Sequence, residues 1–253
     1  MCEGGIMRGG QEVPPELVGK PAIWKLWVAY GVHVFTASGV VAGFVALDAI
    51  IRGDARAAFF WMGVALFIDS VDGTLARRAK VRDLLPKLDG ALLDNLIDYF
   101  NYVIIPAFFF HVSGILPKGW EIVGVAVICL ASAYQFCRID AKTDDHYFRG
   151  FPSYWNAVVF YAIVLALPPW LNMGVILLFG VLVFVPVKYI YPSRAPRHPR
   201  LNVALPALWS AVALVIIYQL PEPSKALVWG SLLYPVYYMT ASLYYTIESA
   251  IRR

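Results

Sequence analysis

Long apolar runs separated by short polar connections make up most of this chain. A helix of about twenty apolar residues is long enough to cross the hydrocarbon core of a bilayer. By this criterion the pattern predicts eight membrane-spanning helices, and the fold class is an all-α polytopic membrane helix bundle. The predicted spans cover residues 24–50, 58–76, 88–112, 120–138, 154–171, 173–189, 203–220 and 226–246.

Two polar stretches complete the predicted organisation. Residues 1–20 are rich in glycine and proline and lack the short apolar region of a signal peptide, which predicts a flexible cytoplasmic tail. Residues 21–253 are then a single integral membrane domain. Residues 81–88 mix charges and leucines between two spans, and we expect them to lie in the membrane interface as a short amphipathic segment.

Composition supports the membrane assignment. Hydrophobic residues make up 60% of the 253 positions and charged residues only 15%, whereas about a quarter of a soluble domain is charged. The net charge of +4 is small and no basic tract is dense, so we expect no nucleic-acid partner. The three cysteines, Cys2, Cys129 and Cys137, have neither a metal-ligand spacing nor the pattern of a disulfide framework.

The distribution of basic residues predicts the orientation of the chain. With the N-terminus inside, the cytoplasmic segments carry 17 of the 21 lysines and arginines, and only Arg52, Arg56, Lys118 and Lys225 lie outside. Because cytoplasmic loops carry an excess of such residues, both termini are predicted to be cytoplasmic. We expect the protein in the inner membrane of a bacterium.

Four carboxylates interrupt the second and third predicted spans at their cytoplasmic ends. Asp69 and Asp72 share one helix face at a spacing of three, and Asp94 and Asp98 share another at a spacing of four. A carboxylate in hydrocarbon is costly unless it is paired, bound to metal or facing a wet cavity. Two such faces turned toward each other would form an all-oxygen site for hard divalent cations.

Small residues and one arginine accompany these carboxylates. Gly73, Ala76 and Gly90 lack bulk, so a helix or ligand can approach the backbone closely. Arg77 lies at the membrane surface, where a guanidinium can bind phosphate through several donors. The combination favours a metal–diphosphate ligand over a lone proton or sodium ion.

The spacing is also a family pattern. The series Asp69-x2-Asp72-Gly73-x2-Ala76-Arg77-x12-Gly90-x3-Asp94-x3-Asp98 resembles the signature of the CDP-alcohol phosphotransferases. The gap of twelve residues after Arg77 is longer than the usual gap of about eight. This gap, the chain length, the eight spans and the stretch HYFRGFPSYWN resemble the bacterial phosphatidylcholine synthase branch of that family.

The resemblance implies a six-helix core with two further C-terminal spans, and a homodimer. It also implies that Asp69, Asp72, Asp94 and Asp98 hold two divalent metal ions, Mn²⁺ or Mg²⁺, which bind the diphosphate of a CDP-linked donor. Asp98 would be the general base. The nucleotide and diphosphate would contact Asp69, Gly73, Ala76, Arg77 and Gly90, and also Thr36 and Ser38 of the first span, which we prefer to His33. We expect His33 and His111 to be packing or interfacial histidines rather than metal ligands.

The activity that this branch implies is transfer of the phosphatidyl group from CDP-diacylglycerol to choline by direct displacement. Aromatic faces recognise quaternary ammonium groups, and the acceptor candidates are Asn101, Tyr102, Tyr134, Tyr154 and Trp155. Arg138 and Arg149 are candidates for the lipid phosphate, although positive charge on cytoplasmic loops is an equally ordinary explanation.

Two alternatives remain open at this point. Another acceptor of the same enzyme class, such as serine, glycerol phosphate or inositol phosphate, would change only the acceptor site. A phosphorylated acceptor would need basic residues facing the cavity, and Lys188 is the main one in a span. A cation transporter would also place carboxylates in a membrane, but near its midplane and with broken helices.

Overall fold

The computed structural model describes residues 7–8, 11–12, 21–192 and 197–251. Within these ranges helices dominate, in agreement with the predicted all-α class. In chain order the elements are β1 Met7–Arg8, β2 Gln11–Glu12, α1 Ile23–Ile51, α2 Ala55–Arg78, α3 Val81–Leu84, α4 Gly90–Tyr99, the π-helix η2 Phe100–Ile104, α5 Ile105–Val112, α6 Glu121–Cys137, β3 Tyr147–Arg149, α7 Trp155–Val164, α8 Pro169–Leu182, β4 Lys188–Ile190, α9 Pro199–Tyr218, α10 Lys225–Ser231 and α11 Leu233–Ile251.

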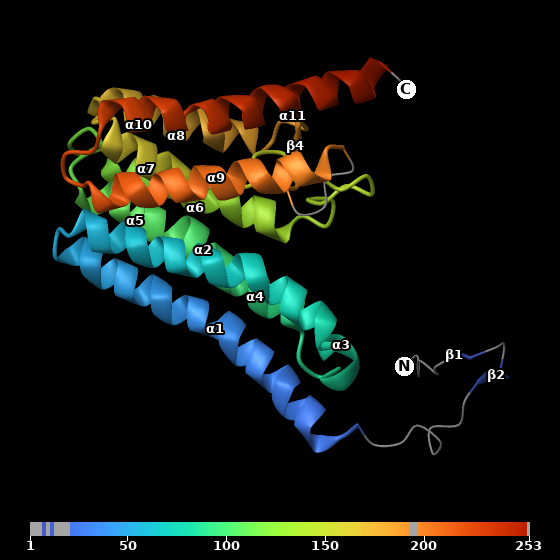
Figure 1. Cartoon of the computed structure of the whole chain (residues 1–253). Coiled ribbons are helices and arrows are strands. Elements are labelled where there is room, and N and C mark those ends of the chain that lie inside the picture. Colours follow the sequence, from blue (N-terminus) through green and yellow to red (C-terminus); the bar gives the residue numbers. More distant parts are fainter. Residues whose placement is uncertain (1–6, 9–10, 13–20, 193–196, 252–253) are drawn as a thin grey trace.

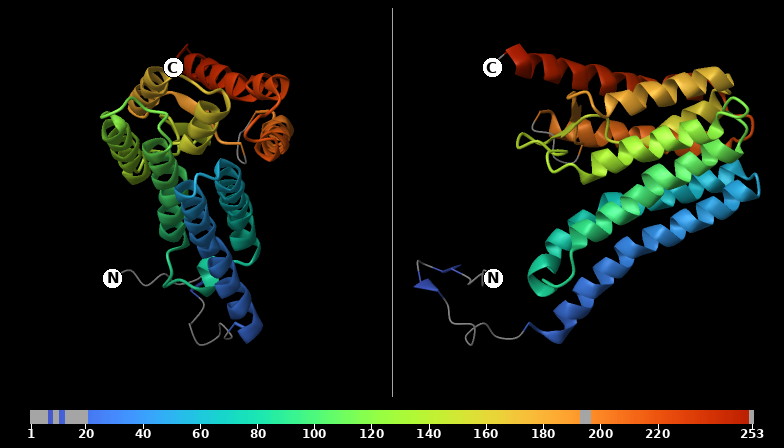
Figure 2. Two further views of the ribbon diagram at one scale, coloured as in Figure 1. Left: turned by 90° about the vertical axis from the view of Figure 1, so that its left-hand side faces the viewer. Right: turned by 180° about the vertical axis from the view of Figure 1, so that it is seen from behind.

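The long helices run side by side, with their connections gathered at two ends (Figure 1). The turn between α1 and α2 lies at one end, and α3 and β4 lie at the other. Helix α1 begins and α11 ends at the same end as α3, as the two further views also show (Figure 2). This arrangement fits an even number of membrane crossings.

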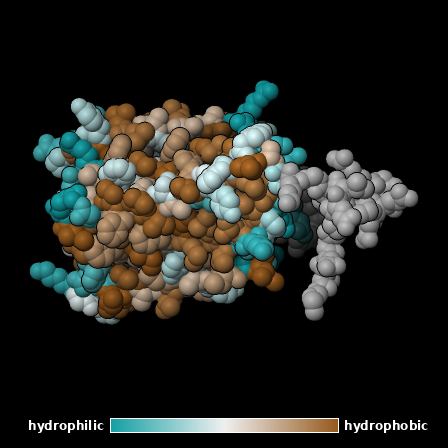
Figure 3. Space-filling view, turned by 90° about the horizontal axis from the view of Figure 1, so that it is seen from below, coloured by the Kyte–Doolittle hydropathy of each residue, from teal (hydrophilic) through white to brown (hydrophobic). Residues whose placement is uncertain are grey.

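The outer surface suits a bilayer. Helices α1, α2 and α9 are long and apolar enough to cross a membrane, and α6, α7 and α8 are shorter apolar helices. Large side chains such as Val34, Phe44 and Phe67 point outward and are more than 60% exposed. Figure 3 shows a broad hydrophobic surface between hydrophilic patches at the two ends. The all-α membrane bundle is therefore confirmed.

Helices α1 and α2 pair closely, and α1 also packs against the third span. Asp54 caps α2 by accepting a hydrogen bond of 2.9 Å from the N–H of Ala57. A Cβ on Gly43 of α1 would lie only 2.2 Å from Oδ1 of Asn101, so only glycine allows this approach. The amide Nδ2 of Asn101 in turn donates a hydrogen bond of 3.2 Å to the carbonyl oxygen of Gly39.

The third predicted span is one continuous run of helix that contains a π turn, η2. Pro106 has no N–H to donate to the carbonyl of Tyr102, four residues earlier, and the helix widens just before this proline. Such turns are rare and often occur at functional sites. Here η2 carries Asn101 and Tyr102, and it begins two residues after Asp98.

Three predicted boundaries were wrong, and prolines explain two of them. The fifth span ends at Val164 instead of 171, because Pro168 and Pro169 begin the next helix. The sixth ends at Leu182 instead of 189, because Pro186 cannot continue a helix. Lys188–Ile190 instead forms β4, which pairs antiparallel with β3. The eighth span is divided into α10 and α11 and extends to Ile251.

The two remaining polar segments are partly described. The predicted interfacial segment contains the single turn α3, whose Val81 is buried together with Leu85 against Ala29 and Val32 of α1. Of the predicted tail, the structure describes β1 and β2, which pair antiparallel, and the rest lies outside the described residues.

Candidate active site

Three of the four predicted carboxylates meet between α2 and α4. Asp69 from α2 and Asp94 and Asp98 from α4 each offer an oxygen, and these oxygens lie within 4.8 Å of one another. The spacing of four places the α4 pair on one face, and the close pairing of the helices turns that face toward Asp69. Such a set of carboxylate oxygens could hold a divalent metal ion.

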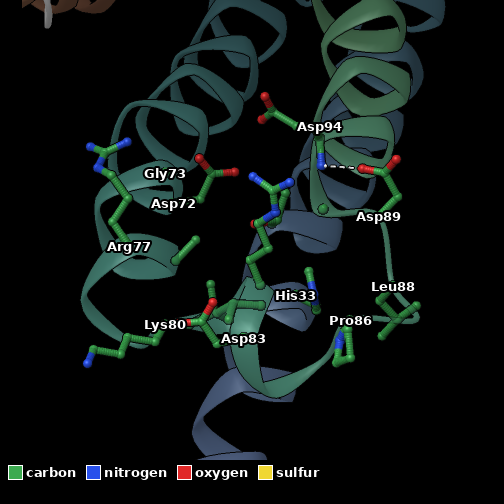
Figure 4. A pocket seen from close by; sticks show the side chains of 17 residues that line it. His33, Asp72, Gly73, Arg77, Lys80, Asp83, Pro86, Leu88, Asp89 and Asp94 are labelled. Carbon is green, nitrogen blue, oxygen red and sulfur yellow. Dashed lines mark hydrogen bonds between the residues drawn. The ribbon is translucent and has the colours of Figure 1, made fainter. Parts of the chain in front are cut away.

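Asp72 occupies a neighbouring position, one turn after Asp69. It is only 5% exposed, although it lines a cavity of about 810 Å³ together with Asp94. Thr36 of α1 and Arg77 interact with its carboxyl group. Figure 4 shows Asp72 and Asp94 pointing into the space between their helices.

The cavity opens between α1, α2, α3 and the start of α4. It brings together Gly73, Ala76, Arg77, Gly90 and Thr36, all five of which were predicted to contact the nucleotide. It also includes Lys80 and Arg82, so three basic residues line it beside the carboxylates. This combination of charges suits a nucleotide diphosphate with its metal ions.

Local contacts fix the shape of this cavity. A Cβ on Gly73 would lie 3.3 Å from Nη1 of Arg77. Nη2 of the same arginine donates a hydrogen bond of 3.0 Å to Oγ1 of Thr74. Asp89 caps α4 by accepting hydrogen bonds of 3.0 Å from the N–H groups of Ala91 and Leu92 (Figure 4). The cap sets the start of α4 and thereby the position of Asp94 one turn later.

Tyrosines lie beside the carboxylate cluster. The hydroxyl of Tyr102 donates a hydrogen bond of 2.6 Å to Oδ2 of Asp69. Tyr154, at the start of α7, interacts electrostatically with the same carboxylate. Of the five predicted acceptor residues, Tyr102 therefore contacts the cluster directly, and Tyr154 is near enough to interact with it electrostatically.

The other predicted acceptor residues have partners elsewhere. Asn101 forms the hydrogen bond to Gly39 of α1 described above. Trp155 is fully buried, and its Nε1 donates a hydrogen bond of 2.8 Å to Oγ of Ser132. Tyr134 packs on Phe184 with ring centroids 4.9 Å apart. Ser38, predicted to contact the nucleotide, donates to the carbonyl of Phe35 in its own helix and is not among the residues that line the cavity.

The two arginines predicted to bind lipid phosphate are joined by a carboxylate. Arg138 donates to Asp140 at 2.7 and 3.0 Å, and Arg149 donates to the same carboxylate at 2.6 Å. Hydrogen bonds from Arg138 and then Arg149 hold the pKa of Asp140 well below its usual range. Both guanidinium groups are thus engaged within the loop between α6 and β3.

Three further residues at or near the site were not among the predicted site residues. Lys142, in the same loop, interacts electrostatically with Asp69, Asp94 and Asp98. Lys142 lies in a loop, so no helical spacing links it to the three aspartates. The only sequence signal for it was its position in the long polar connection. His33, expected to be a packing or interfacial histidine, and Asp89, the cap of α4, both line the cavity.

Comparison with known proteins gives consistent matches. No family model matches the chain. It is 44% identical to the phosphatidylcholine synthase of Legionella pneumophila over 229 residues, which cover 88% of this chain and 90% of that protein. The phosphatidylcholine synthase of Pseudomonas aeruginosa is 40% identical, covering 76% of this chain and 81% of its own. That of Borreliella burgdorferi is 36% identical, with coverages of 90% and 98%.

Proposed function

This chain belongs to the phosphatidylcholine synthase family, and we propose that it transfers the phosphatidyl group of CDP-diacylglycerol to choline at the aspartate cluster between α2 and α4. The products are phosphatidylcholine and CMP. The observation that carries this assignment of the site is the approach of Asp69, Asp94 and Asp98 to within 4.8 Å, beside a cavity large enough for a nucleotide.

The donor set fits divalent metal ions. All four ligands are carboxylates, the oxygen donors that Mg²⁺ and Mn²⁺ prefer. We propose that Asp69, Asp94 and Asp98 hold one ion and that Asp72, facing the cavity with Asp94, helps to hold a second. When bound, the ions neutralise the diphosphate and the leaving CMP. Arg77 adds guanidinium donors at the phosphate end of the cavity.

The chemistry assigned to the residues is a direct displacement. Choline is a poor nucleophile, and Asp98 accepts its hydroxyl proton during attack. The choline oxygen forms a bond to the phosphorus that carries diacylglycerol, and the bond from that phosphorus to the oxygen of CMP breaks. The hydroxyl of Tyr102 holds Asp69 in place through its 2.6 Å bond.

Choline is favoured over a phosphorylated acceptor by what surrounds the site. Tyr102 and Tyr154 bring aromatic rings beside the carboxylates, and such rings attract quaternary ammonium groups. Lys188, the basic residue considered for an acceptor phosphate, donates instead to Asp145 at 2.5 Å and to Ser249 at 3.2 Å. The transporter alternative loses support because the acids lie at one end of their helices beside a cavity that contains Arg77.

The membrane placement follows from the charge distribution. The end of the bundle that carries α3 and the cavity holds most of the basic residues, so we place it, with both termini, in the cytoplasm at the bacterial inner membrane. A homodimer rests on the family resemblance alone and stays a prediction.

The test is release of CMP from CDP-diacylglycerol by purified protein with Mn²⁺. Choline, serine, glycerol phosphate and inositol phosphate are offered separately. We expect release with choline only, its loss with a metal chelator, and a fall of at least a hundredfold in Asp98→Asn with nucleotide binding retained. Release with another alcohol would replace the acceptor and keep the site. A trapped phosphatidyl-enzyme would refute direct displacement.

A further inference from the structure

A positively charged side chain lies beside the carboxylate cluster. Lys142 interacts electrostatically with all three aspartates that meet between α2 and α4, yet no carboxylate in the described ranges forms an ion pair with it. Its ammonium group lies instead over the ring of Tyr191, 5.9 Å from the ring centroid. A cation is attracted to an aromatic face within roughly this distance. The ring and the carboxylates therefore attract a cation to the same place.

The strands hold this ring in place. Tyr191 directly follows β4, and its ring packs on that of Phe148 of β3 with centroids 4.5 Å apart. Phe148 pairs with Tyr189 across the two strands, and Lys142 forms a single antiparallel bridge with the same Phe148. The backbone of Lys142 and the ring of Tyr191 are thus fixed relative to each other through one shared partner.

Tyr191 lies on the side of the cluster that carries Tyr154. Tyr154 interacts electrostatically with both Asp69 and Tyr191. Neither Tyr191 nor Lys142 is among the residues that line the cavity between α1, α2, α3 and α4. In choline only two carbon atoms separate the hydroxyl oxygen from the nitrogen. A choline molecule whose hydroxyl reaches Asp98 must therefore place its quaternary ammonium group beside the cluster.

Lys142 can leave the ring at little cost. Its side chain is exposed, so water can solvate the ammonium group once it moves away. The nearby Lys188 differs, because Asp145 accepts a hydrogen bond of 2.5 Å from its ammonium group and Ser249 accepts one of 3.2 Å. Lys188 is thus tied to its place by two partners, whereas Lys142 can exchange with another cation.

We propose that the quaternary ammonium group of choline binds on the ring of Tyr191, in the place that the ammonium group of Lys142 takes in this structure. Tyr191 is then a specificity-determining residue for the acceptor, and Lys142 is a competing cation that swings into water when choline enters. This inference rests on the proposed function, because it takes choline as the acceptor. A quaternary ammonium group donates no hydrogen bonds, so an aromatic face is a suitable partner for it.

The test is equilibrium binding of radiolabelled choline to purified full-length protein with CMP and Mn²⁺ present. Lys142→Met should tighten choline binding about two- to fivefold, the range for one exposed cation–π contact. General damage to the structure would weaken binding instead. Lys142→Arg should match the wild type, because the guanidinium keeps the competing charge. Lys118→Met is the matched control, since Lys118 is exposed between α5 and α6, and it should also match the wild type.

The ring contact is tested in the Lys142→Met background. There Tyr191→Leu should weaken choline binding about two- to fivefold and Tyr191→Phe should leave it unchanged, with CMP affinity constant throughout. In the wild-type background the loss in Tyr191→Leu should be smaller, because the competing contact of Lys142 disappears with the ring.

The outcomes separate the two parts of the inference. Choline affinity that falls or stays unchanged in Lys142→Met would overturn the competition. Full affinity after Tyr191→Leu in the Lys142→Met background, or an equal loss after Tyr191→Phe, would overturn the ring contact. Failure of the wild type to bind choline or to release CMP with it would instead overturn the proposed function.

Discussion

Replacement of Gly43 by alanine should disturb the contact between α1 and the helix that carries Asp94 and Asp98, the proposed metal ligands. The new Cβ would lie 2.2 Å from Oδ1 of Asn101, 2.7 Å from Cδ1 of Ile105 and 2.9 Å from Cε1 of Phe100. Three atoms on one short stretch of helix are too close, so rotation of one side chain cannot relieve them all. Relief needs all three side chains to shift or α1 and η2 to move apart, and Asp98 lies only two residues before η2.

The magnitude follows from two opposing terms. An extra methyl group in a packed core costs roughly 1–3 kcal/mol. Alanine gains up to about 1 kcal/mol over glycine in the interior of a helix. The net loss of roughly 0–2 kcal/mol should lower the apparent melting temperature by up to about 8 °C, at 2–4 °C per kcal/mol for a chain of this size. Turnover should fall further, up to about a hundredfold, because small displacements of catalytic groups are costly.

The assay is thermal unfolding in detergent together with choline-dependent CMP release. Gly31→Ala on α1 and Gly63→Ala on α2 are matched controls, since a Cβ at either position meets nothing within 4 Å. Both should retain the melting temperature and turnover of the wild type, or gain slightly in stability. A Gly43→Ala protein that melts no lower than these controls and keeps full turnover would refute the packing argument.

Two further predictions concern the tyrosine at the cluster and the carboxylate of the α6–β3 loop. Tyr102→Phe removes the hydroxyl that donates to Asp69 but keeps the aromatic ring. We therefore expect kcat to fall about tenfold or more while the KM for choline stays within twofold. A large change in KM with kcat unchanged would contradict this prediction. Asp140→Asn should speed trypsin cleavage after Lys142 at pH 7, because Arg138 and Arg149 lose their shared partner. Because the pKa of folded Asp140 is depressed, its carboxylate stabilises the loop at every pH above the unfolded pKa near 3.8, and this effect is lost only as the pH falls through the lower folded pKa. Protection of the wild-type loop from trypsin should therefore be the same at pH 6 as at pH 8, and equal cleavage of both proteins at pH 7 would contradict the prediction.

The carboxylate site could be predicted because it depends on helix geometry. Spacings of three and four residues decide which side chains share a face, whatever else the chain does. The approach of Asp69 to Asp94 and Asp98 needed one further assumption, that the two faces meet, and the cost of isolated charge in a membrane justified it. The same reasoning does not apply to a loop, and Lys142 was missed for that reason.

Aromatic partners could not be predicted, because tertiary packing decides them. Trp155 and Tyr154 are adjacent in the sequence, yet Trp155 is buried against Ser132 while Tyr154 interacts with Asp69. In the fold, apolar length predicted the spans, but β3 and β4 are three residues long and have no periodicity to detect. Pro186 was the one visible sign that the sixth span ends early.

The strands explain what the C-terminal helices contribute to the site. The N–H groups of Lys188 and Ile190 on β4 donate hydrogen bonds of 2.8 and 3.2 Å to the hydroxyl oxygens of Thr246 and Ser242 on α11. The hydroxyl of Tyr238, also on α11, donates 3.0 Å to the carbonyl of Ile190, and its ring lies 6.1 Å from that of Tyr154. Since β4 pairs with β3, which follows the loop of Lys142, α11 supports the proposed acceptor side of the cluster, whereas α1, α2 and α4 line the cavity proposed for the nucleotide. Under the proposed function, the two substrates would therefore approach the cluster from parts of the chain that are held in place by different helices.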